Sequence, residues 1–175
     1  ANNWPTSIQG VSTDYLTIRK LDISQGSLFT EYDINAAAKV CILGKTVINN
    51  LFKDGEQPLG QIIRYNQIPF TVIGILKEKG VNTFGQDQDD VIIAPFTTVQ
   101  KRILGINHIQ NIYLSAINEE SSQLAIEEVE TVLRKNPKLV SGNTNKFEIR
   151  SQQELLSMMG STNQMMTLLL AAIAG

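Results

Sequence analysis

The chain has 175 residues, of which 42% are hydrophobic and 18% charged, and its formal net charge is -2. This composition is typical of a folded globular protein, and the length suits one domain or two small lobes. There is no basic footprint for nucleic acid, and a single cysteine, Cys41, excludes an intramolecular disulfide.

The first 35 residues predict a strand, a short helix and a loop. Thr6 to Val11 is typical of a strand. The polar run Ser12 to Asp14 can cap a helix over Tyr15 to Ile18. Gly26 and the polar stretch from Thr30 to Asn35 then indicate a loop.

The segment from Ala38 to Leu76 is the most informative part of the chain. An apolar run, Val40 to Leu43, is typical of a buried strand and ends at Gly44. Apolar residues follow at helical spacing as far as Phe52. Two runs rich in β-branched and aromatic residues, joined by Asn66-Gln67, then predict a hairpin. Together these signals predict a compact β-α-β-β unit.

The next segment alternates between loop and regular structure. Lys77 to Asp90 has the glycines and aspartates of a loop. Val91 to Ala94 is a short predicted strand that Pro95 stops. A helix with Val99, Ile103 and Leu104 on its inner face is predicted to end at Gly105.

Residues 109–150 predict a strand, a helix and a second strand. Ile109 to Ile117 alternates imperfectly, as a strand does. Asn118 to Lys135 is the clearest helix, with acidic residues at its start and basic residues at its end. Ser141 to Asn145 is a predicted polar loop, and Phe147 to Arg150 a predicted final strand.

The two ends of the chain indicate an excised piece of a longer protein. The chain opens without methionine or a signal-like segment. A helix is predicted from Gln152, amphipathic at first and then apolar from Met165 to Ala174 except for Thr167. A spanning helix needs about 20 apolar residues, so this run fits either a buried C-terminal helix or the first half of a transmembrane helix.

Gly44-Lys45-Thr46 follows a predicted strand and opens a predicted helix, as a phosphate-binding loop does. That motif requires a glycine five positions before Gly44, where this chain has Lys39. We therefore interpret the segment as an ordinary strand-helix turn and predict that the chain binds no nucleotide.

Other polar groups do not form a recognisable catalytic or metal site. Asp87, Asp89 and Asp90 lack the spacing of a calcium loop and are typical of a solvated loop with one aspartate bonded to its own backbone. His108 is the only histidine, and Cys41 lies in an apolar run. The methionines, which are favoured as packing surface rather than metal ligands, are Met158, Met159, Met165 and Met166. We predict no catalytic residue, cofactor or metal.

An ordered series of segments resembles a known family over nearly the whole chain. The matching segments are VCILGKTVINNLF, PLGQIIRYNQIPFTVIGIL, DQDDVIIAPFTTVQKRILG and FEIRSQQELLSMMGSTNQMMTLLLAAIAG. The series is similar to the MacB-like periplasmic core domain of ABC transporter permeases of the MacB/FtsX type. The resemblance favours a truncated transmembrane helix at the C-terminus.

The resemblance implies a non-enzymatic domain between the first two transmembrane helices of a bacterial inner-membrane permease, on the periplasmic side. The implied partners are a cytoplasmic ATPase domain or subunit, a second permease copy in a homodimer, a periplasmic adaptor protein, and the membrane through flanking helices. The implied function passes ATP-driven motion to substrate export. Alternatives are lipoprotein release or cell-wall-hydrolase signalling within the family, and a free-standing ligand-binding protein or enzyme outside it.

The expected fold class is α+β, with two α/β lobes and a C-terminal helix leading to a truncated transmembrane segment. Residues 1–28 and 106–151 are expected to form an outer lobe, because their faces cannot be buried alone. Residues 29–105 are expected to form a lobe inserted in sequence into it, and residues 152–175 a stalk helix and the start of the membrane segment. In the outer lobe, contacts are expected between Ile8 or Val11 and the predicted strands Ile109–Ile117 or Phe147–Ile149.

Two sets of residues are predicted to serve the function. Phe84, Asn82 and Gln86, on the loop between Lys77 and Asp90, are candidate partner contacts. A helix-weak stretch with Gly160, Ser161 and Thr162 is the candidate coupling element at the membrane surface.

Overall fold

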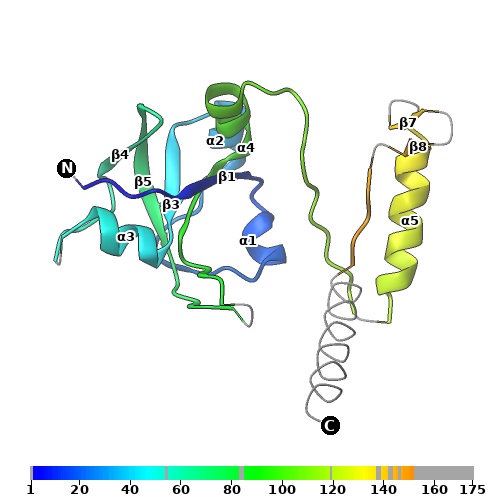
Figure 1. Cartoon of the computed structure of the whole chain (residues 1–175), viewed down its shortest axis with the longest axis horizontal. Coiled ribbons are helices and arrows are strands. Elements are labelled where there is room, and N and C mark those ends of the chain that lie inside the picture. Colours follow the sequence, from blue (N-terminus) through cyan, green and yellow to red (C-terminus); the bar gives the residue numbers. More distant parts are fainter. Residues whose placement is uncertain are drawn as a thin grey trace, which may run out of the picture. The chain divides into compact units, whose positions relative to one another are not determined.

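The computed structural model describes residues 2–53, 55–82, 85–118, 120–136, 139–141, 144–145 and 147–151. The chain divides into two compact units, Ala1–Leu114 and Ser115–Gly175. Figure 1 shows the elements of both units coloured along the sequence.

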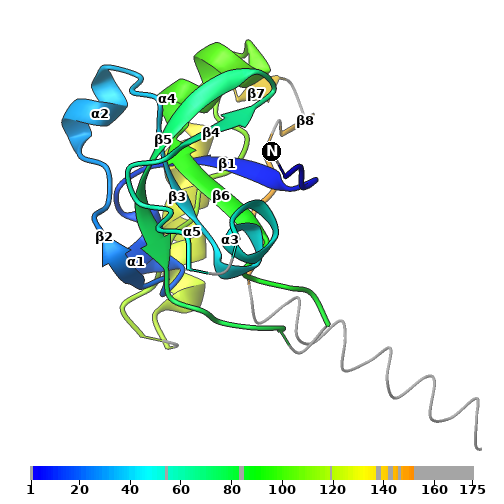
Figure 2. The same ribbon diagram turned by 90° about the vertical axis from the view of Figure 1, so that its left-hand side faces the viewer.

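A mixed β-sheet of six strands is the centre of unit 1 (Figures 1 and 2). The strands lie in the order β1-β6-β3-β5-β2, and β4 pairs with the first half of β5. β1 is parallel to β6 and β3 is parallel to β5, whereas the β3–β6, β2–β5 and β4–β5 pairs are antiparallel. The bounds are β1 Ser7–Val11, β2 Ile23–Gly26, β3 Val40–Leu43, β4 Ile62–Tyr65, β5 Ile68–Leu76 and β6 Val91–Pro95.

Short helices lie between these strands or follow the last of them. They are α1 Tyr15–Ile18, α2 Glu31–Asn35, α3 Lys45–Leu51, α4 Phe96–Thr98 and the π-helical turn η1 Val99–Leu104. Gly105 ends η1 in the left-handed region at φ 63°, which confirms the predicted stop. Leu104, however, is exposed and does not lie on the inner face of this helix.

The loop predicted for Thr30 to Asn35 is wrong, because α2 begins there with a capping box. The Asp33 amide donates to the Thr30 hydroxyl, and the Asp33 carboxylate accepts from the Thr30 amide at 2.7 Å. The hydrogen bond from the Thr30 amide, together with that from its hydroxyl, lowers the pKa of Asp33. The polar residues that indicated a loop are therefore the cap of a helix.

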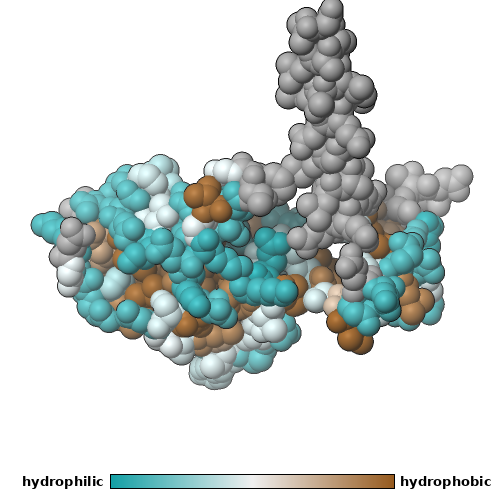
Figure 3. Space-filling view, turned by 90° about the horizontal axis from the view of Figure 1, so that it is seen from below, coloured by the Kyte–Doolittle hydropathy of each residue, from teal (hydrophilic) through white to brown (hydrophobic). Residues whose placement is uncertain are grey.

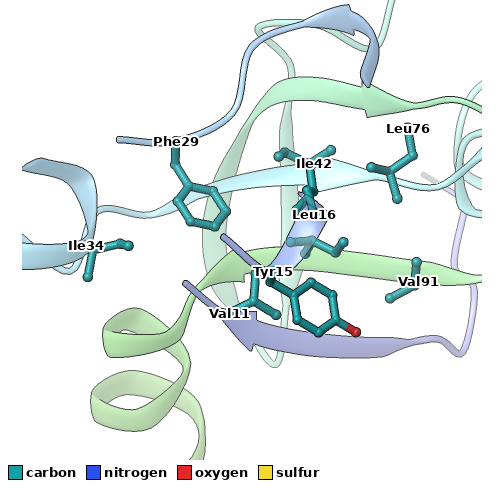
Figure 4. Packing of buried hydrophobic residues seen from close by; sticks show 9 residues of the cluster. Val11, Tyr15, Leu16, Phe29, Ile34, Ile42, Leu76 and Val91 are labelled. Atoms are coloured by element: carbon teal, nitrogen blue, oxygen red, sulfur yellow. The ribbon is translucent and has the colours of Figure 1, made fainter. Parts of the chain in front are cut away.

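Apolar side chains cover both faces of the sheet. Alternate residues of β3 point to opposite faces, so Ile42 lies in one cluster and its neighbours Cys41 and Leu43 lie in the other. Figure 4 shows the cluster around Ile42, which also contains Phe29. Burial on both faces explains the continuous apolar runs of β3 and β6, which are typical of central strands. Seen from outside, apolar patches interrupt a mainly hydrophilic surface (Figure 3).

Cys41 is a fully buried small hydrophobe, as predicted. Its side chain is 0% exposed, and burial raises the pKa of the thiol to about 12. The thiolate, which is the reactive form, is therefore not populated at neutral pH.

The predicted β-α-β-β unit is confirmed by β3, α3, β4 and β5. The hairpin turn has Asn66 at φ 47° and Gln67 at φ 67°. Both central residues therefore occupy the left-handed region, as a two-residue type I′ hairpin turn requires. The strand predicted for Val91 to Ala94 is also confirmed as β6, although it includes Pro95.

The N-terminal strand β1 belongs to the sheet of unit 1. β1 pairs with β6, in the register Ser7 to Val91 and Val11 to Pro95, and β2 pairs with β5. The N-terminal strands therefore bury their apolar side chains against the sheet formed by residues 29–105. The two-lobe arrangement itself stays a prediction.

Unit 2 contains a helix and a short hairpin. The helix α5, Ser122–Arg134, confirms the predicted helix with a later start. Asn118 accepts the Ser121 amide at 2.8 Å and the Ser121 hydroxyl at 2.6 Å, so the chain makes a turn before the helix begins. The hairpin has strands β7 Val140–Ser141 and β8 Thr144–Asn145, where a polar loop was predicted.

Two predicted strands are wrong as strands. The described residues of Ile109 to Ile117 and of Phe147 to Arg150 form no ladder with any strand that the structure describes. An isolated extended segment lacks the interstrand hydrogen bonds that define a strand. The predicted stalk helix from Gln152, with Gly160, Ser161 and Thr162, lies outside the described residues. No helix within the described ranges is long and apolar enough to span a membrane.

Candidate functional site

The loop from Lys77 to Asp90, between β5 and β6, is the candidate site because it carries the predicted partner-contact residues. Its base is fixed by Asp89, which is only 4% exposed. The Lys79 amide donates to both oxygens of the Asp89 carboxylate at 3.0 and 3.1 Å, and the Gly80 amide donates to one of them at 2.7 Å. A buried carboxylate that accepts several amide hydrogens holds the backbone around it in one conformation.

The other two aspartates of this loop also bind protein donors. Asp87 accepts the Thr46 hydroxyl at 2.6 Å and the Asp89 amide at 2.8 Å. The Thr46 hydrogen bond is the largest cause that lowers the pKa of Asp87, and the Asp89 amide adds to it. Asp90 accepts the indole N–H of Trp4 at 3.0 Å. The loop is thereby joined to α3 and to the segment before β1.

The sequence interpretation of these aspartates is confirmed in part. Asp87 does bond the backbone two residues further on, as predicted for one aspartate of a solvated loop. The burial of Asp89 was missed, because its donors at Lys79 and Gly80 lie about ten positions away in the sequence. Only the Asp-x-Asp spacing was a usable local signal.

The tip of the loop brings together two of the three predicted contact residues. Asn82 and Gln86 exchange backbone and side-chain hydrogen bonds: the Asn82 amide donates to the Gln86 carbonyl at 2.9 Å, and the Gln86 amide donates to the Asn82 side-chain oxygen at 3.0 Å. Gln86 and Val81 are exposed. Phe84 lies outside the described residues.

The Gly44-Lys45-Thr46 turn packs directly against this loop. A Cβ atom at Gly44 would lie 2.1 Å from the Asp89 carbonyl oxygen, so only glycine fits there. The Gly44 amide donates to the Val91 carbonyl at 2.9 Å, and the Thr46 hydroxyl is bonded to Asp87. A phosphate at this turn would face the Asp87 carboxylate, which is electrostatically unfavourable. Gly44 and Thr46 therefore have a structural explanation that requires no ligand.

The lone histidine does not point to a site either. His108 is exposed, and its carbonyl accepts a hydrogen bond from the Gln100 side chain at 2.9 Å. No group of three histidine, cysteine, aspartate or glutamate side chains within the described ranges could hold a metal ion.

A family model described as the MacB-like periplasmic core domain matches residues 1–132. Among curated proteins, the macrolide export ATP-binding/permease protein MacB of Chlorobium luteolum is 38% identical over 172 residues, covering 98% of this chain and 26% of the relative. The protein of the same name from Chlorobaculum tepidum is 37% identical, covering 95% and 25%. This chain thus spans about a quarter of the length of the curated relatives it matches.

Two solved structures are similar to this one. The periplasmic region of MacB from Actinobacillus actinomycetemcomitans is 25% identical with a TM-score of 0.56, covering 74% of this chain and 57% of that one. The extracellular domain of the noncanonic ABC-type transporter YknZ from Gram-positive bacteria is 24% identical with a TM-score of 0.62, covering 75% and 64%. The second likeness concerns the fold alone.

Proposed function

The chain belongs to the family of MacB-like periplasmic core domains, which form the periplasmic part of MacB-type ABC transporter permeases. On that premise we propose that it passes ATP-driven motion to substrate export. The observation that carries the proposal is the family match over residues 1–132. The sheet of unit 1 supports it, since the periplasmic region of a MacB protein has a similar fold.

The proposal places ATP hydrolysis outside this chain, on a cytoplasmic domain or a separate subunit. Curated relatives of about four times this length are named as combined ATP-binding and permease proteins, which supports such a division. The whole permease would work as a homodimer in the inner membrane, with this domain on the periplasmic side and its flanking helices in the membrane.

The proposed docking element for a periplasmic adaptor is the tip of the loop from Lys77 to Asp90. Asn82 and Gln86 hold each other through paired hydrogen bonds, and the base of the loop is fixed by buried Asp89. Asn82 and Gln86, held by each other above a fixed base, would lose little conformational entropy when a partner binds. Phe84, between them in sequence, is proposed as the apolar part of the contact.

The proposed coupling element is the stretch with Gly160, Ser161 and Thr162. A helix that continues from the membrane into this domain would transmit motion, and a weak stretch within it would set how much motion arrives. In the intact permease, Gly160→Pro is expected to reduce export while this domain stays folded, because proline breaks a helix locally at a cost of about 3 kcal/mol. Normal export at normal expression would exclude this element.

The transport proposal is tested with the full-length gene expressed, with its adaptor, in an efflux-deficient bacterium. The names of the relatives suggest a macrolide, so intracellular accumulation of labelled erythromycin is measured. Lower accumulation that requires an intact ATPase site supports export. Unchanged accumulation of erythromycin together with mislocalised lipoproteins in a deletion strain would favour the lipoprotein-release alternative.

A further inference from the structure

A groove of about 450 Å³ lies in unit 1 between β1 and the π-helical turn η1. We name it the β1–η1 groove. One wall is formed by β1 and α1 and the other by α4 and η1. Its apolar and aromatic lining includes Ile8, Val11, Tyr15, Val99, Ile106 and Tyr113.

An extended segment, residues 106–113, closes one side of the groove and is fixed at both ends. At its start, the Ile106 amide donates to the Gln100 carbonyl at 3.2 Å, and the Gln100 side chain donates to the His108 carbonyl at 2.9 Å. At its end, the Tyr113 ring packs edge-on against the Tyr15 ring, with the ring centroids 5.3 Å apart. The Cζ atom of Arg19 lies 5.5 Å from the centroid of the Tyr113 ring. Each attachment is of moderate strength, and the two together hold the segment over the groove.

The lining has an unusual chemical character for this protein. The chain has 15 basic and 17 acidic residues, yet the groove is lined by no lysine, arginine, aspartate or glutamate. The polar groups of the lining are amides and hydroxyls, among them Gln9 and Asn111, together with the imidazole of His108. The Tyr15 hydroxyl is already bonded to the Gln9 side chain at 2.9 Å.

We propose that the β1–η1 groove binds an uncharged, mainly apolar small molecule. Its volume lies in the range of small-molecule sites, about 300–1,000 Å³, and such sites are lined mostly by apolar and aromatic side chains with a few polar groups. A charged ligand would lose hydration in the groove, whose lining has no carboxylate, ammonium or guanidinium group to pair with it. The ligand is therefore selected by shape and by the absence of charge, whether or not the whole protein exports that molecule.

Two apolar side chains that line the groove are left exposed to solvent. Ile109 and Ile112 line it from the closing segment, and their side chains are 64% and 66% exposed. An apolar molecule in the groove would cover part of this area, and removing apolar surface from water is favourable in proportion to the area covered. This gain is the physical source of the affinity.

The test uses two probes of closely related shape with the full chain. N-phenyl-1-naphthylamine is uncharged, and 8-anilinonaphthalene-1-sulfonate adds a sulfonate to the same ring system. The uncharged probe is expected to bind saturably, with a rise in fluorescence, and the sulfonate probe about tenfold more weakly or worse. Equal binding of both probes, or no saturable binding of the uncharged one, would overturn the proposal.

A matched pair of variants locates the binding. Ile112→Asp puts a carboxylate in the groove and is expected to weaken the uncharged probe at least about tenfold. Ile62→Asp is the control, since Ile62 is also 66% exposed but lies on β4, away from the groove. Both variants change exposed side chains, and the fluorescence of Trp4, the only tryptophan, checks that unit 1 is folded.

Two other results would count against the proposal. Equal weakening by both variants, or by neither, would place the probe elsewhere on the chain. The other result is a dimer in sedimentation that Ile112→Asp dissociates and that excludes the probe. The groove would then be an interface between copies of the chain, and the small-molecule site would be wrong.

Discussion

The Thr46 hydroxyl donates a 2.6 Å hydrogen bond to the Asp87 carboxylate, which joins the first turn of α3 to a loop 41 positions later in the chain. Beside it, Gly44 lies so close to the Asp89 carbonyl that a Cβ atom has no room. These two contacts make the start of α3 and the loop before β6 one structural piece. The candidate docking loop is therefore supported by the sheet rather than free of it.

Replacement of Gly44 tests this close approach. Gly44→Ala is expected to destabilise unit 1 by at least about 2 kcal/mol, because the new Cβ would overlap the Asp89 carbonyl oxygen and the backbone must shift. The φ angle of Gly44 is −77°, so the loss comes from the overlap and not from backbone strain. Urea unfolding followed by Trp4 fluorescence measures it. Lys45→Ala is the control, and an equal effect of both variants would contradict the explanation.

The buried carboxylate of Asp89 is expected to be the main stabilising group of the loop. Asp89→Asn keeps the size of the side chain but removes its charge and one acceptor oxygen. Because the carboxylate accepts the Lys79 and Gly80 amides, we expect a loss of about 1.5–3 kcal/mol in the free energy of unfolding. The same change at exposed Asp87 is expected to cost less than about 1 kcal/mol. The reverse order in urea unfolding would show that Asp89 is not the anchor.

The lowered pKa of Asp87 predicts a pH dependence of stability. A carboxyl group whose pKa is lower in the folded chain stabilises the fold above its ordinary pKa of 3.8, and that contribution is lost as the pH falls through the folded value. Thr46→Val removes the largest cause of the shift, so the variant is expected to lose less stability than the wild type below pH 3.8. The difference should be less than about 1 kcal/mol, because Asp87 is exposed.

Unfolding free energies of the wild type and Thr46→Val at pH 7 and at pH 3 measure this difference. Asp33, whose pKa is also lowered by Thr30, titrates alike in both proteins and cancels from the comparison. Parallel curves over this pH range would mean that the Thr46 hydrogen bond does not set the protonation of Asp87.

How far the fold could be predicted depended on the distance between interacting residues. The unit from β3 to β5 was predicted because each joint has a local signal: Gly44 ends a strand, and Asn66-Gln67 forms the hairpin turn. The parallel pairing of β1 with β6 joins residues more than 80 positions apart, and nothing in either segment specifies the other. The capping box that begins at Thr30 was also a local signal, but the segment was predicted as a loop because its residues are mostly polar.

The candidate site could be predicted only as a loop with exposed polar residues. Composition located the loop, and the proximity of Asn82 and Gln86 agrees with their grouping in sequence. The donors for Asp87 and Asp90 come from Thr46 and Trp4, which are distant in the chain. From the sequence, the three aspartates of the loop were therefore predicted to be a solvated cluster, although each one accepts a hydrogen bond from a specific protein donor.

Amide hydrogen exchange distinguishes the fixed base of this loop from its tip. The Lys79 and Gly80 amides donate to a buried acceptor, whereas the hydrogen bond from the Gln86 amide to the Asn82 side chain is exposed. Amides bonded to buried acceptors exchange only through larger opening motions. We therefore expect Lys79 and Gly80 to exchange at least about tenfold more slowly than Gln86, and the tip to exchange faster than β5.

Exchange rates of the 15N-labelled chain, measured by NMR at neutral pH, give each amide separately. In Asp89→Asn, exchange at Lys79 and Gly80 is expected to become faster, while exchange at Gln86 is unchanged, because the tip is held by Asn82 and not by Asp89. If Gln86 is as protected as Gly80 in the wild type, the loop is one rigid body. If all three amides change together in the variant, the tip depends on the base, and a partner that binds the tip would also sense the burial of Asp89.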